Sequence, residues 1–311
     1  AAVHFDMEQY RYKNATLEVL KPLLMEAEFR DRTDIGITLQ AYLRDSYQDL
    51  QQLIAWAKKR GQPITLRLIK GAYWDRETIV ARQNHWPTPV YHHKSSTDAN
   101  FERMTALLLT NHEHLHAAIG SHNIRSQAHA IAIAQALNIP KEHIEFQVLY
   151  GMADNLAIAL AQQGHRVRVY CPYGALIPGM AYLIRRLLEN TANTSFLRQS
   201  LSGQPLEGLL AAPVWGEGDA VCSELIPMPM PASTALVTRI DPSADTDYAI
   251  KNARSAATAA LASVRAKLGQ NYQPLIDGEW VQTTATIQSV NPSNPAEIVG
   301  TIGQITIDVA D

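Results

Sequence analysis

A segment near residue 185 carries arginine, tyrosine and glutamate side chains at spacings that could bind an anion. On a helix, Tyr182, Arg186 and Glu189 lie on one face at positions i, i+4 and i+7. Arg185 lies beside them, within reach of Glu189. A guanidinium offers two parallel N–H groups to a carboxylate, and an adjacent arginine could neutralise the same group. The segment predicts a carboxylate site, although a surface Arg–Glu pair beside a leucine-rich core face remains an alternative.

A second polar group ends an apolar run at residues 64–69. Arg67 would point toward the C-terminal end of that strand, and Lys70 follows it directly. Gly71 and Ala72 are small enough for the backbone to approach a ligand closely. These residues suit a bulky cofactor, although a structural ion pair of Arg67 remains open as the alternative.

Histidines at positions 112, 114 and 116 have the His-x-His spacing of some metal sites. They precede an apolar run and so lie at the N-terminal side of a strand, whereas barrel enzymes place their chemistry at the C-terminal ends. A solvated loop is the favoured interpretation, and no metal site is predicted. A metal-dependent barrel hydrolase built on these histidines is retained only as a competing hypothesis.

Six short apolar runs, each followed by a stretch with helical periodicity, indicate a parallel α/β fold. The predicted strands are residues 3–7, 37–43, 64–69, 115–121, 144–149 and 167–171. The predicted helices between them include residues 15–29, 47–60, 99–110, 125–137 and 155–163. A (β/α)8 barrel and an open doubly wound sheet both fit this alternation.

Polar residues within or just after the strands favour the barrel, because barrel enzymes gather their functional residues there. These residues are Asp6, Gln40, Arg67, Lys70, His122, Gln147 and Tyr170. No Gly-x-Gly-x-x-Gly motif follows a predicted strand, which counts against a dinucleotide-binding open sheet.

Composition excludes several classes of protein. The chain has 311 residues and a formal net charge of −3, so nucleic acid is not an expected partner. It has no apolar run of about 18 residues, and any membrane contact would be peripheral. Cys171 and Cys222 are too few for a disulfide framework, which favours a reducing cytoplasm.

The pattern changes after Gly203. We predict a barrel over residues 1–204, a linker over 205–240, and the beginning of another domain over 241–311. The last region opens with an alanine-rich helix and continues with short strands that turn at Asp277-Gly278 and Asn291-Pro292. Both ends of the sequence are expected to lie inside a longer protein.

Several motifs together closely resemble the proline dehydrogenase family over residues 1–200. They are Asp6, the run Arg67 to Asp75 (RLIKGAYWD), Ser121-His122-Asn123, Glu145-Phe146-Gln147, Tyr170 and the run Tyr182 to Phe196 (YLIRRLLENTANTSF). Residues 276–280 (IDGEW) and 290–295 (VNPSNP) are similar to the start of an aldehyde dehydrogenase. This order resembles the bifunctional bacterial proline utilization flavoenzymes.

The resemblance implies a role for each matching residue. Arg185 and Arg186 would pair with the carboxylate of L-proline, and the proline ring would be lined by Asp6, Tyr73, Tyr170 and Tyr182. Asp6 and Arg67 would be catalytic, with Arg67 bound to flavin N5. The FAD would further be held by Gln40, Lys70, Gly71, Ala72, Trp74, Ser121, His122, Asn123, Gln147, Glu189, Ser195 and Phe196. Ser121 stands where the family usually has threonine.

The resemblance also implies a reaction and its setting. Hydride transfer to flavin N5 would convert L-proline to pyrroline-5-carboxylate, and a membrane quinone would then accept the electrons. A second domain, whose NAD site lies outside this chain, would oxidise glutamate semialdehyde to glutamate. The protein would be cytoplasmic or peripheral at a bacterial inner membrane, and homo-oligomers are compatible with the sequence.

The visible part of the barrel supplies about six of eight βα units, so a substrate-binding lysine early in the family's barrel is expected to lie outside the chain. An inactive interior fragment of such an enzyme is therefore the alternative to an active proline dehydrogenase.

Overall fold

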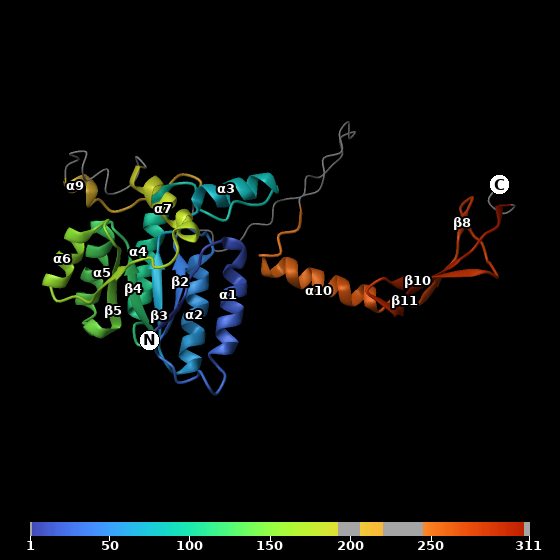
Figure 1. The fold of residues 1–311 in the computed structure, drawn as a ribbon, viewed down its shortest axis with the longest axis horizontal. Helices are drawn as coiled ribbons and strands as arrows, with labels where there is room; N and C mark the ends of the chain where they lie inside the picture. Colours follow the sequence, from blue (N-terminus) through green and yellow to red (C-terminus); the bar gives the residue numbers. More distant parts are fainter. Residues whose placement is uncertain (1, 192–205, 220–244, 308–311) are drawn as a thin grey trace. The chain divides into compact units, whose positions relative to one another are not determined.

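The computed structural model describes residues 2–191, 206–219 and 245–307, which Figure 1 draws in colour. The chain divides into two compact units, residues 1–249 and 250–311. The boundaries predicted at residues 204 and 240 remain predictions.

The first unit is built on a six-stranded parallel sheet whose strands follow one another in chain order. The strands are β1 (Val3–Phe5), β2 (Ile35–Gln40), β3 (Ile64–Ile69), β4 (Leu115–Gly120), β5 (Ile144–Leu149) and β6 (Val167–Tyr170). All six predicted strands are confirmed, and β3 and β5 match at both ends. A doubly wound sheet reverses its strand order at a switch point, whereas this sheet does not and curls into a half-barrel.

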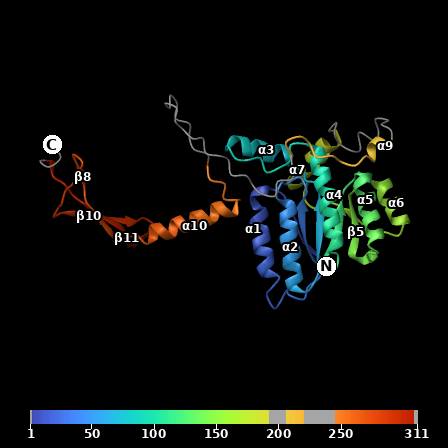
Figure 2. The ribbon, with the colours of Figure 1, turned by 180° about the vertical axis from the view of Figure 1, so that it is seen from behind.

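Helices connect consecutive strands, as parallel pairing requires. The connecting helices are α1 (Tyr10–Leu23), α2 (Ser46–Arg60), α3 (Trp74–Gln83), α4 (Lys94–Thr110), α5 (Ile124–Ala136) and α6 (Asp154–Gln162), with a 3-10 turn η1 (Lys141–His143) before β5. Helix α7 (Leu176–Thr191) and the short helix α9 (Leu206–Leu209) follow β6. Figure 2 shows α1, α2, α4 and α5 side by side along one face of the sheet. Helix α2 ends as predicted at Arg60, and the next residue, Gly61, has a positive φ of 77°.

The first helix differs from its prediction. It spans Tyr10–Leu23 rather than residues 15–29. The apolar periodicity missed its start because one member of the buried face is a cation: Lys13 is 1% exposed and pairs with Asp45 at 2.7 Å. A pattern based on hydrophobicity counts this lysine as a solvent-facing residue.

Helix α3 was not predicted, and α4 begins at Lys94 rather than at residue 99. Helix α3 has no apolar stripe to reveal it, because Glu77, Thr78 and Ala81 are its buried residues. Helix α4 receives no cap from the side chain of its own N-cap residue, His93. Its beginning therefore carries no local signal.

The core lies between the sheet and these helices. Along β3, Ile64, Leu66 and Leu68 are fully buried, whereas the alternating residues are partly buried. Successive strand residues point to opposite faces, so Thr65, Arg67 and Ile69 face the concave inner side of the sheet. The alternation places Arg67 inside the barrel and the leucines against the helices.

The second unit begins with the exposed alanine-rich helix α10 (Lys251–Arg265). A three-stranded sheet follows, in the order β10 (Thr286–Asn291), β11 (Asn294–Gly303) and β7 (Gln270–Tyr272). A small hairpin joins β8 (Leu275–Ile276) to β9 (Glu279–Trp280), and its turn residues Asp277 and Gly278 both have positive φ, as a type I′ turn requires. Among the described residues, no helix is long and apolar enough to span a membrane.

Candidate active site

A cavity of about 850 Å³ opens at the C-terminal ends of the parallel strands. It lies near the upper end of the range for small-molecule sites, about 300–1,000 Å³. Its walls come from every strand end from β1 to β6 and from α4 and α7. The cavity therefore has room for a large cofactor together with a small substrate.

The cavity collects the predicted site residues that precede residue 187. Those lining it are Asp6, Gln40, Arg67, Lys70, Gly71, Ala72, Tyr73, Trp74, Ser121, His122, Asn123, Gln147, Tyr170, Tyr182, Arg185 and Arg186. The side chain of Glu189, together with Ser195 and Phe196, lies outside the described residues. The roles assigned to these residues remain predictions.

Arg67 is held on the inner face by residues of β5 and of the segment that follows β1. Its Nε donates to Gln147 Oε1 at 2.8 Å, and its Nη1 lies 3.5 Å from Asp6 Oδ1. Asp6 also accepts from Thr38 Oγ1 at 3.2 Å. The guanidinium carbon of Arg67 is 5.8 Å from the centre of the Tyr170 ring. The structural ion pair considered above is therefore present, but it lies in the wall of the cavity.

Helix α7 brings Arg185 and Arg186 to the same cavity. Arg185 donates to the Tyr73 hydroxyl, and its guanidinium carbon lies 4.8 Å from the centre of that ring. The guanidinium carbon of Arg186 lies 5.3 Å from the centre of the Tyr182 ring. Burial raises the pKa of Tyr73 and of Tyr182, so both phenols stay protonated. Two cations and two neutral phenols form one side of the cavity.

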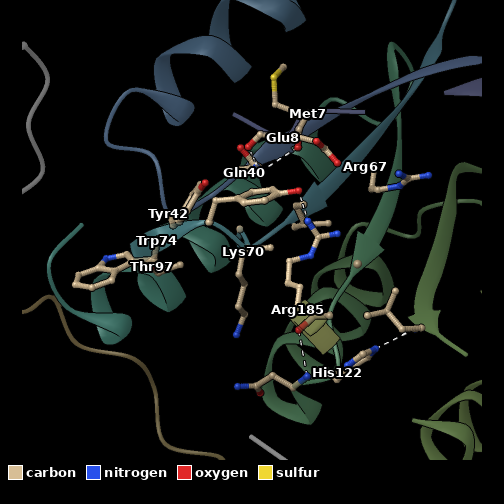
Figure 3. Close-up of a pocket in the computed structure, with 18 of the residues that line it drawn as sticks. Met7, Glu8, Gln40, Tyr42, Arg67, Lys70, Trp74, Thr97, His122 and Arg185 are labelled. Atoms are coloured by element: carbon tan, nitrogen blue, oxygen red, sulfur yellow. Dashed lines mark hydrogen bonds between the residues drawn. The ribbon is translucent and has the colours of Figure 1, made fainter. Parts of the chain in front are cut away.

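Lys70 supplies a further cation, which Figure 3 shows beside the cavity with Arg185 and His122. Its Nζ lies 2.6 Å from Asp98 Oδ1, and Lys94 Nζ lies 2.7 Å from the other oxygen of Asp98. Burial lowers the pKa of Lys70, whereas the two lysines outweigh the opposite effect of burial on Asp98 and lower its pKa. The group keeps a net positive charge at this wall, which suits an anionic part of a ligand.

His122 is neutral and has a defined tautomer. Burial, with a further contribution from Arg186, lowers its pKa to about 4. Its Nε2 accepts a hydrogen bond from the backbone N–H of Leu149 at 2.9 Å. In a neutral imidazole only one ring nitrogen carries a proton, so the proton resides on Nδ1. His122 therefore offers a donor rather than a charge.

Two features of the wall fit a flat polar cofactor. Gly71 has a φ of 125°, and a Cβ at this position would collide with the Tyr42 ring, so only glycine allows this close backbone path. Gln40 Nε2 donates to the carbonyl of Met7 at 3.0 Å, while its buried Oε1 has no hydrogen-bond partner within the described residues. A buried acceptor normally finds a donor, which a ligand with an N–H group would supply. The residues present thus fit a flavin.

Sequence reasoning missed several residues of the wall. They are Met7, Glu8, Tyr42, His92, Lys94, Thr97 and Asp98, together with several small and apolar residues. Asp75, which was part of a family motif but had no predicted role, also lines the wall. Lys94 and Asp98 form an i, i+4 pair, a spacing that could have drawn attention to the start of α4. Nothing in the sequence placed that helix end beside Lys70.

The histidine-rich stretch lies at the opposite end of the strands. His112 Nδ1 is 2.9 Å from His143 Nδ1, and the rings of His116 and His143 stack with centres 4.4 Å apart. The histidines therefore pack together more than the predicted solvated loop implied. Across the ranges that the structure describes, no group of three His, Cys, Asp or Glu residues is arranged to hold a metal ion.

The sequence and structure were compared with known proteins. The family model described as "Proline dehydrogenase" matches residues 1–199. The chain is 30% identical to the bifunctional protein PutA of Salmonella typhimurium over 96% of its length, and 30% identical to proline dehydrogenase 1 of Bacillus subtilis over 64%. These matches cover 23% of the PutA chain and 58% of the Bacillus chain.

Solved structures give the same result. A crystal structure of proline utilization A from Bdellovibrio bacteriovorus, inactivated by N-propargylglycine, superposes with a TM-score of 0.83 at 42% identity. The superposition covers 99% of this chain and 31% of that one. This chain spans about a quarter of the length of its curated PutA relatives: 23% of the protein from Salmonella typhimurium and 24% of the protein from Escherichia coli.

Proposed function

Because this chain belongs to the proline dehydrogenase family, we propose that it forms most of the flavin-binding barrel of an enzyme that oxidises L-proline to pyrroline-5-carboxylate. The observation that carries the proposal is the cavity at the strand ends, where Arg67, Arg185 and Arg186 meet three tyrosines. Three cations around an apolar-rimmed space suit a small ligand with a carboxylate.

Arg185 and Arg186 would bind the proline carboxylate. Adjacent residues on a helix point in different directions, so the two guanidinium groups would approach the carboxylate from different sides. Tyr73 and Tyr182 already contact these guanidinium groups and would limit their motion. Tyr73, Tyr170 and Tyr182 would pack against the ring and exclude water from it.

Arg67 and Asp6 would act at the reacting end of the substrate. FAD, when bound, would supply the electron acceptor that takes a hydride from the proline carbon next to nitrogen at its N5 atom. The guanidinium of Arg67 would stabilise the charge that develops there. Asp6, which lies 3.5 Å from Arg67, would balance the charge of the arginine and line the ring.

The remaining residues of the cavity wall would hold the FAD. The backbone at Lys70, Gly71 and Ala72 would pass close to it, and Gln40 and His122 would contribute an acceptor and a donor. Trp74, Ser121, Asn123 and Gln147 would complete the wall, together with Glu189, Ser195 and Phe196.

The wider role follows from the relatives and the resemblance. We propose that the chain is part of a bifunctional enzyme that passes electrons to a membrane quinone. A second domain would bind NAD and oxidise glutamate semialdehyde to glutamate. Residues 276–280 and 290–295 resemble the start of such a domain. The name of the relatives, bifunctional protein PutA, supports this arrangement. Peripheral membrane contact and a homo-oligomeric state are part of the same proposal.

The alternative functions receive less support. An inactive fragment is not favoured, because the polar residues of the cavity are oriented by specific contacts such as that of Arg67 with Gln147. A metal-dependent hydrolase is not favoured, because the histidines it would need lie at the N-terminal ends of the strands.

The test uses the intact protein that contains this chain. We expect the purified protein to carry bound flavin, and L-proline to bleach the flavin absorbance without oxygen. Arg185→Met should raise the proline concentration needed for half-maximal bleaching while leaving the flavin bound. Protein without flavin, or flavin that proline does not reduce, would overturn the proposal.

A further inference from the structure

Glu145 in β5 carries a buried charge that the proposed function does not use. It is 6% exposed and does not line the cavity. Arg168 of β6 binds both of its oxygens, with Nε to Oε1 and Nη2 to Oε2 both at 2.8 Å. Gln147 Nε2 adds a third donor to Oε1 at 2.5 Å. Such a bidentate pair fixes the carboxylate in both position and orientation.

The strand register places this group beside Arg67. Glu145 and Gln147 are two residues apart on β5, so both face the inner side of the sheet. Ala118 of β4 pairs with Arg67 on one side and with Glu145 on the other. One row higher, Gly120 pairs with Gln147, which in turn pairs with Arg168.

The small residues of β4 explain how Arg67 reaches β5. Arg67 is on β3, so its side chain must cross β4 to meet Gln147. Ala118 and Gly120 hold the two inward positions of β4 along this path. A larger side chain at either position would occupy the space through which the guanidinium passes. The sheet is built to let Arg67 and Gln147 meet.

The hydrogen bonds along this path run in one direction only. A guanidinium has only donors and an ionised carboxylate has only acceptors. Gln147 lies between them, so its Oε1 must face Arg67 Nε and its Nε2 must face Glu145. If the amide rotated by half a turn, its NH2 group would face the donors of Arg67. Glu145 therefore determines which end of the amide Arg67 meets.

This arrangement needs the Glu145 carboxyl group to be ionised, and its surroundings favour the ionised form. Burial opposes ionisation of Glu145, but the hydrogen bonds from Arg168 and Gln147 outweigh it and lower the pKa of the carboxyl group. His4 is the neighbouring titratable group on β1, and burial lowers its pKa to about 4, so it adds no charge near neutral pH.

We propose that Glu145, fixed by Arg168, is a positioning residue that orients the Gln147 amide and thereby holds Arg67 in the geometry that flavin reduction requires. The inference rests on the proposed function. Arg67 lines the cavity, with its Nε bound to Gln147 on one side and its Nη1 3.5 Å from Asp6 on the other, so the Gln147 amide fixes one end of the guanidinium. Glu145 would thus act on the reaction without touching the substrate or the cofactor.

The test is a double-mutant cycle in the intact protein, with Glu145→Gln, Gln147→Met and the double variant. We expect Glu145→Gln to slow flavin reduction by proline about 10- to 100-fold and to weaken FAD binding, with the KM for proline unchanged. In the Gln147→Met background, Glu145→Gln should cause no further loss, because its effect passes through that amide. An effect of Glu145 that bypasses the Gln147 amide would instead give losses that add.

The matched control is Glu102→Gln. Glu102 forms the same kind of bidentate pair, with Arg125 at 2.8 and 3.1 Å, between α4 and α5, and its side chain does not line the cavity. The positioning role would be wrong if proline reduced the flavin equally fast in the Glu145→Gln and Glu102→Gln variants. It would also be wrong if Glu145→Gln slowed the reaction further in the Gln147→Met background. The proposed function would survive both results, because it depends only on reduction of the wild-type flavin by proline.

A second variant covers the case in which Glu145→Gln does not fold. The side chain of Arg168 is 57% exposed, so Arg168→Met should be tolerated. It removes the two hydrogen bonds that fix the Glu145 carboxylate, while Gln147 Nε2 can still donate to it. We therefore expect FAD affinity and reduction rate to fall in the same direction, but by less. Unchanged values for both quantities would equally overturn the inference.

Discussion

The two ends of the parallel sheet use the same residue types in different ways. At the C-terminal ends, Arg67 and Arg185 bind side chains and border a cavity. At the N-terminal ends, Arg60 is 3% exposed and donates to backbone carbonyls, among them those of Leu24 at 3.2 Å and Phe29 at 3.1 Å. A buried arginine alone therefore says little about function. The end of the strand at which it lies, and whether its partners are side chains or backbone, separates a site from a structural support.

The largest expected effect sharpens this comparison at the C-terminal end. Arg67→Met in the intact protein should slow flavin reduction by proline about 100- to 1,000-fold, because it removes the cation beside the flavin position. The thermal midpoint should change little, since Arg67 contacts the cavity wall rather than the main core. Stopped-flow absorbance measures the rate and calorimetry measures the midpoint. A variant that keeps its rate but unfolds earlier would place Arg67 with the structural arginines.

The converse prediction concerns the N-terminal end. Arg60→Met should reduce the free energy of unfolding by about 3 kcal/mol, because it leaves several buried carbonyl groups without donors. The KM for proline and the rate of flavin reduction should stay unchanged. Denaturant titration of the intact protein, followed by a signal from the barrel, measures the loss.

Arg32→Met is the matched control for this prediction. The Arg32 side chain is 48% exposed and pairs with Asp34 only two residues away, so its loss should change the free energy of unfolding far less than the loss of Arg60. If Arg60→Met were as stable as Arg32→Met, or if it slowed flavin reduction at full folding, the division between the two ends would not hold.

A smaller effect is expected where the wall of the cavity depends on a distant residue. Asp219 is fully buried and accepts hydrogen bonds from the backbone N–H groups of His92 and His93 at 3.0 and 2.8 Å, and from Arg44 at 2.7 Å. These contacts cap the start of α4, whose first turns carry Lys94 and Asp98 to the cavity. Asp219→Asn should lower the free energy of unfolding by about 1–2 kcal/mol.

The same variant should also weaken FAD binding, because the lysine and aspartate at the start of α4 would lose their support. Fluorescence titration of the apoprotein with FAD measures this change. An Asp219→Asn variant that loses stability but binds FAD with wild-type affinity would show that the cap supports the fold alone.

These contacts also show how far the sequence could predict the structure. The strands were predictable because each is a short apolar run, and β3 and β5 agree at both ends. The start of α4 was not, because the carboxylate that caps it comes from 126 residues away. The start of α1 was missed because its buried Lys13 depends on Asp45 and Asp49 at the start of α2. Pairings between distant residues leave no periodic trace.

The candidate site divides in the same way. Arg67, Lys70 and Gln147 could be predicted to meet, because polar residues at the C-terminal ends of parallel strands converge at one edge of a barrel. Tyr42, Lys94 and Asp98 could not, because they come from a loop and a helix whose position depends on packing. The contacts that hold Gln147 through Glu145 and Arg168 could not be predicted, because they depend on the register between β5 and β6.

The effect that is smallest near neutral pH grows as the pH decreases, and it could break the contrast between the two ends. Burial first, and then the neighbouring His143, lower the pKa of His116 at the N-terminal end to about 4, and burial lowers that of His122 at the C-terminal end to about 4. In the unfolded chain both histidines have a pKa near 6.5. Between these values the unfolded state binds more protons, so stability falls as the pH decreases from about 6.5 to about 4. Each histidine contributes a slope of at most about 1.4 kcal/mol per pH unit.

Urea titrations of the intact protein from neutral pH to pH 4 should detect this slope. His116→Asn and His122→Asn should each flatten it by a similar amount, whereas only His122→Asn should alter FAD binding. Equal acid sensitivity with unequal effects on the cofactor would mean that burial acts alike at both ends and that the cavity alone makes the C-terminal end functional. An unchanged slope in His116→Asn would mean that His116 binds protons equally well in the folded and the unfolded state. Burial would then not lower the pKa of His116, and the contrast would have to be redrawn.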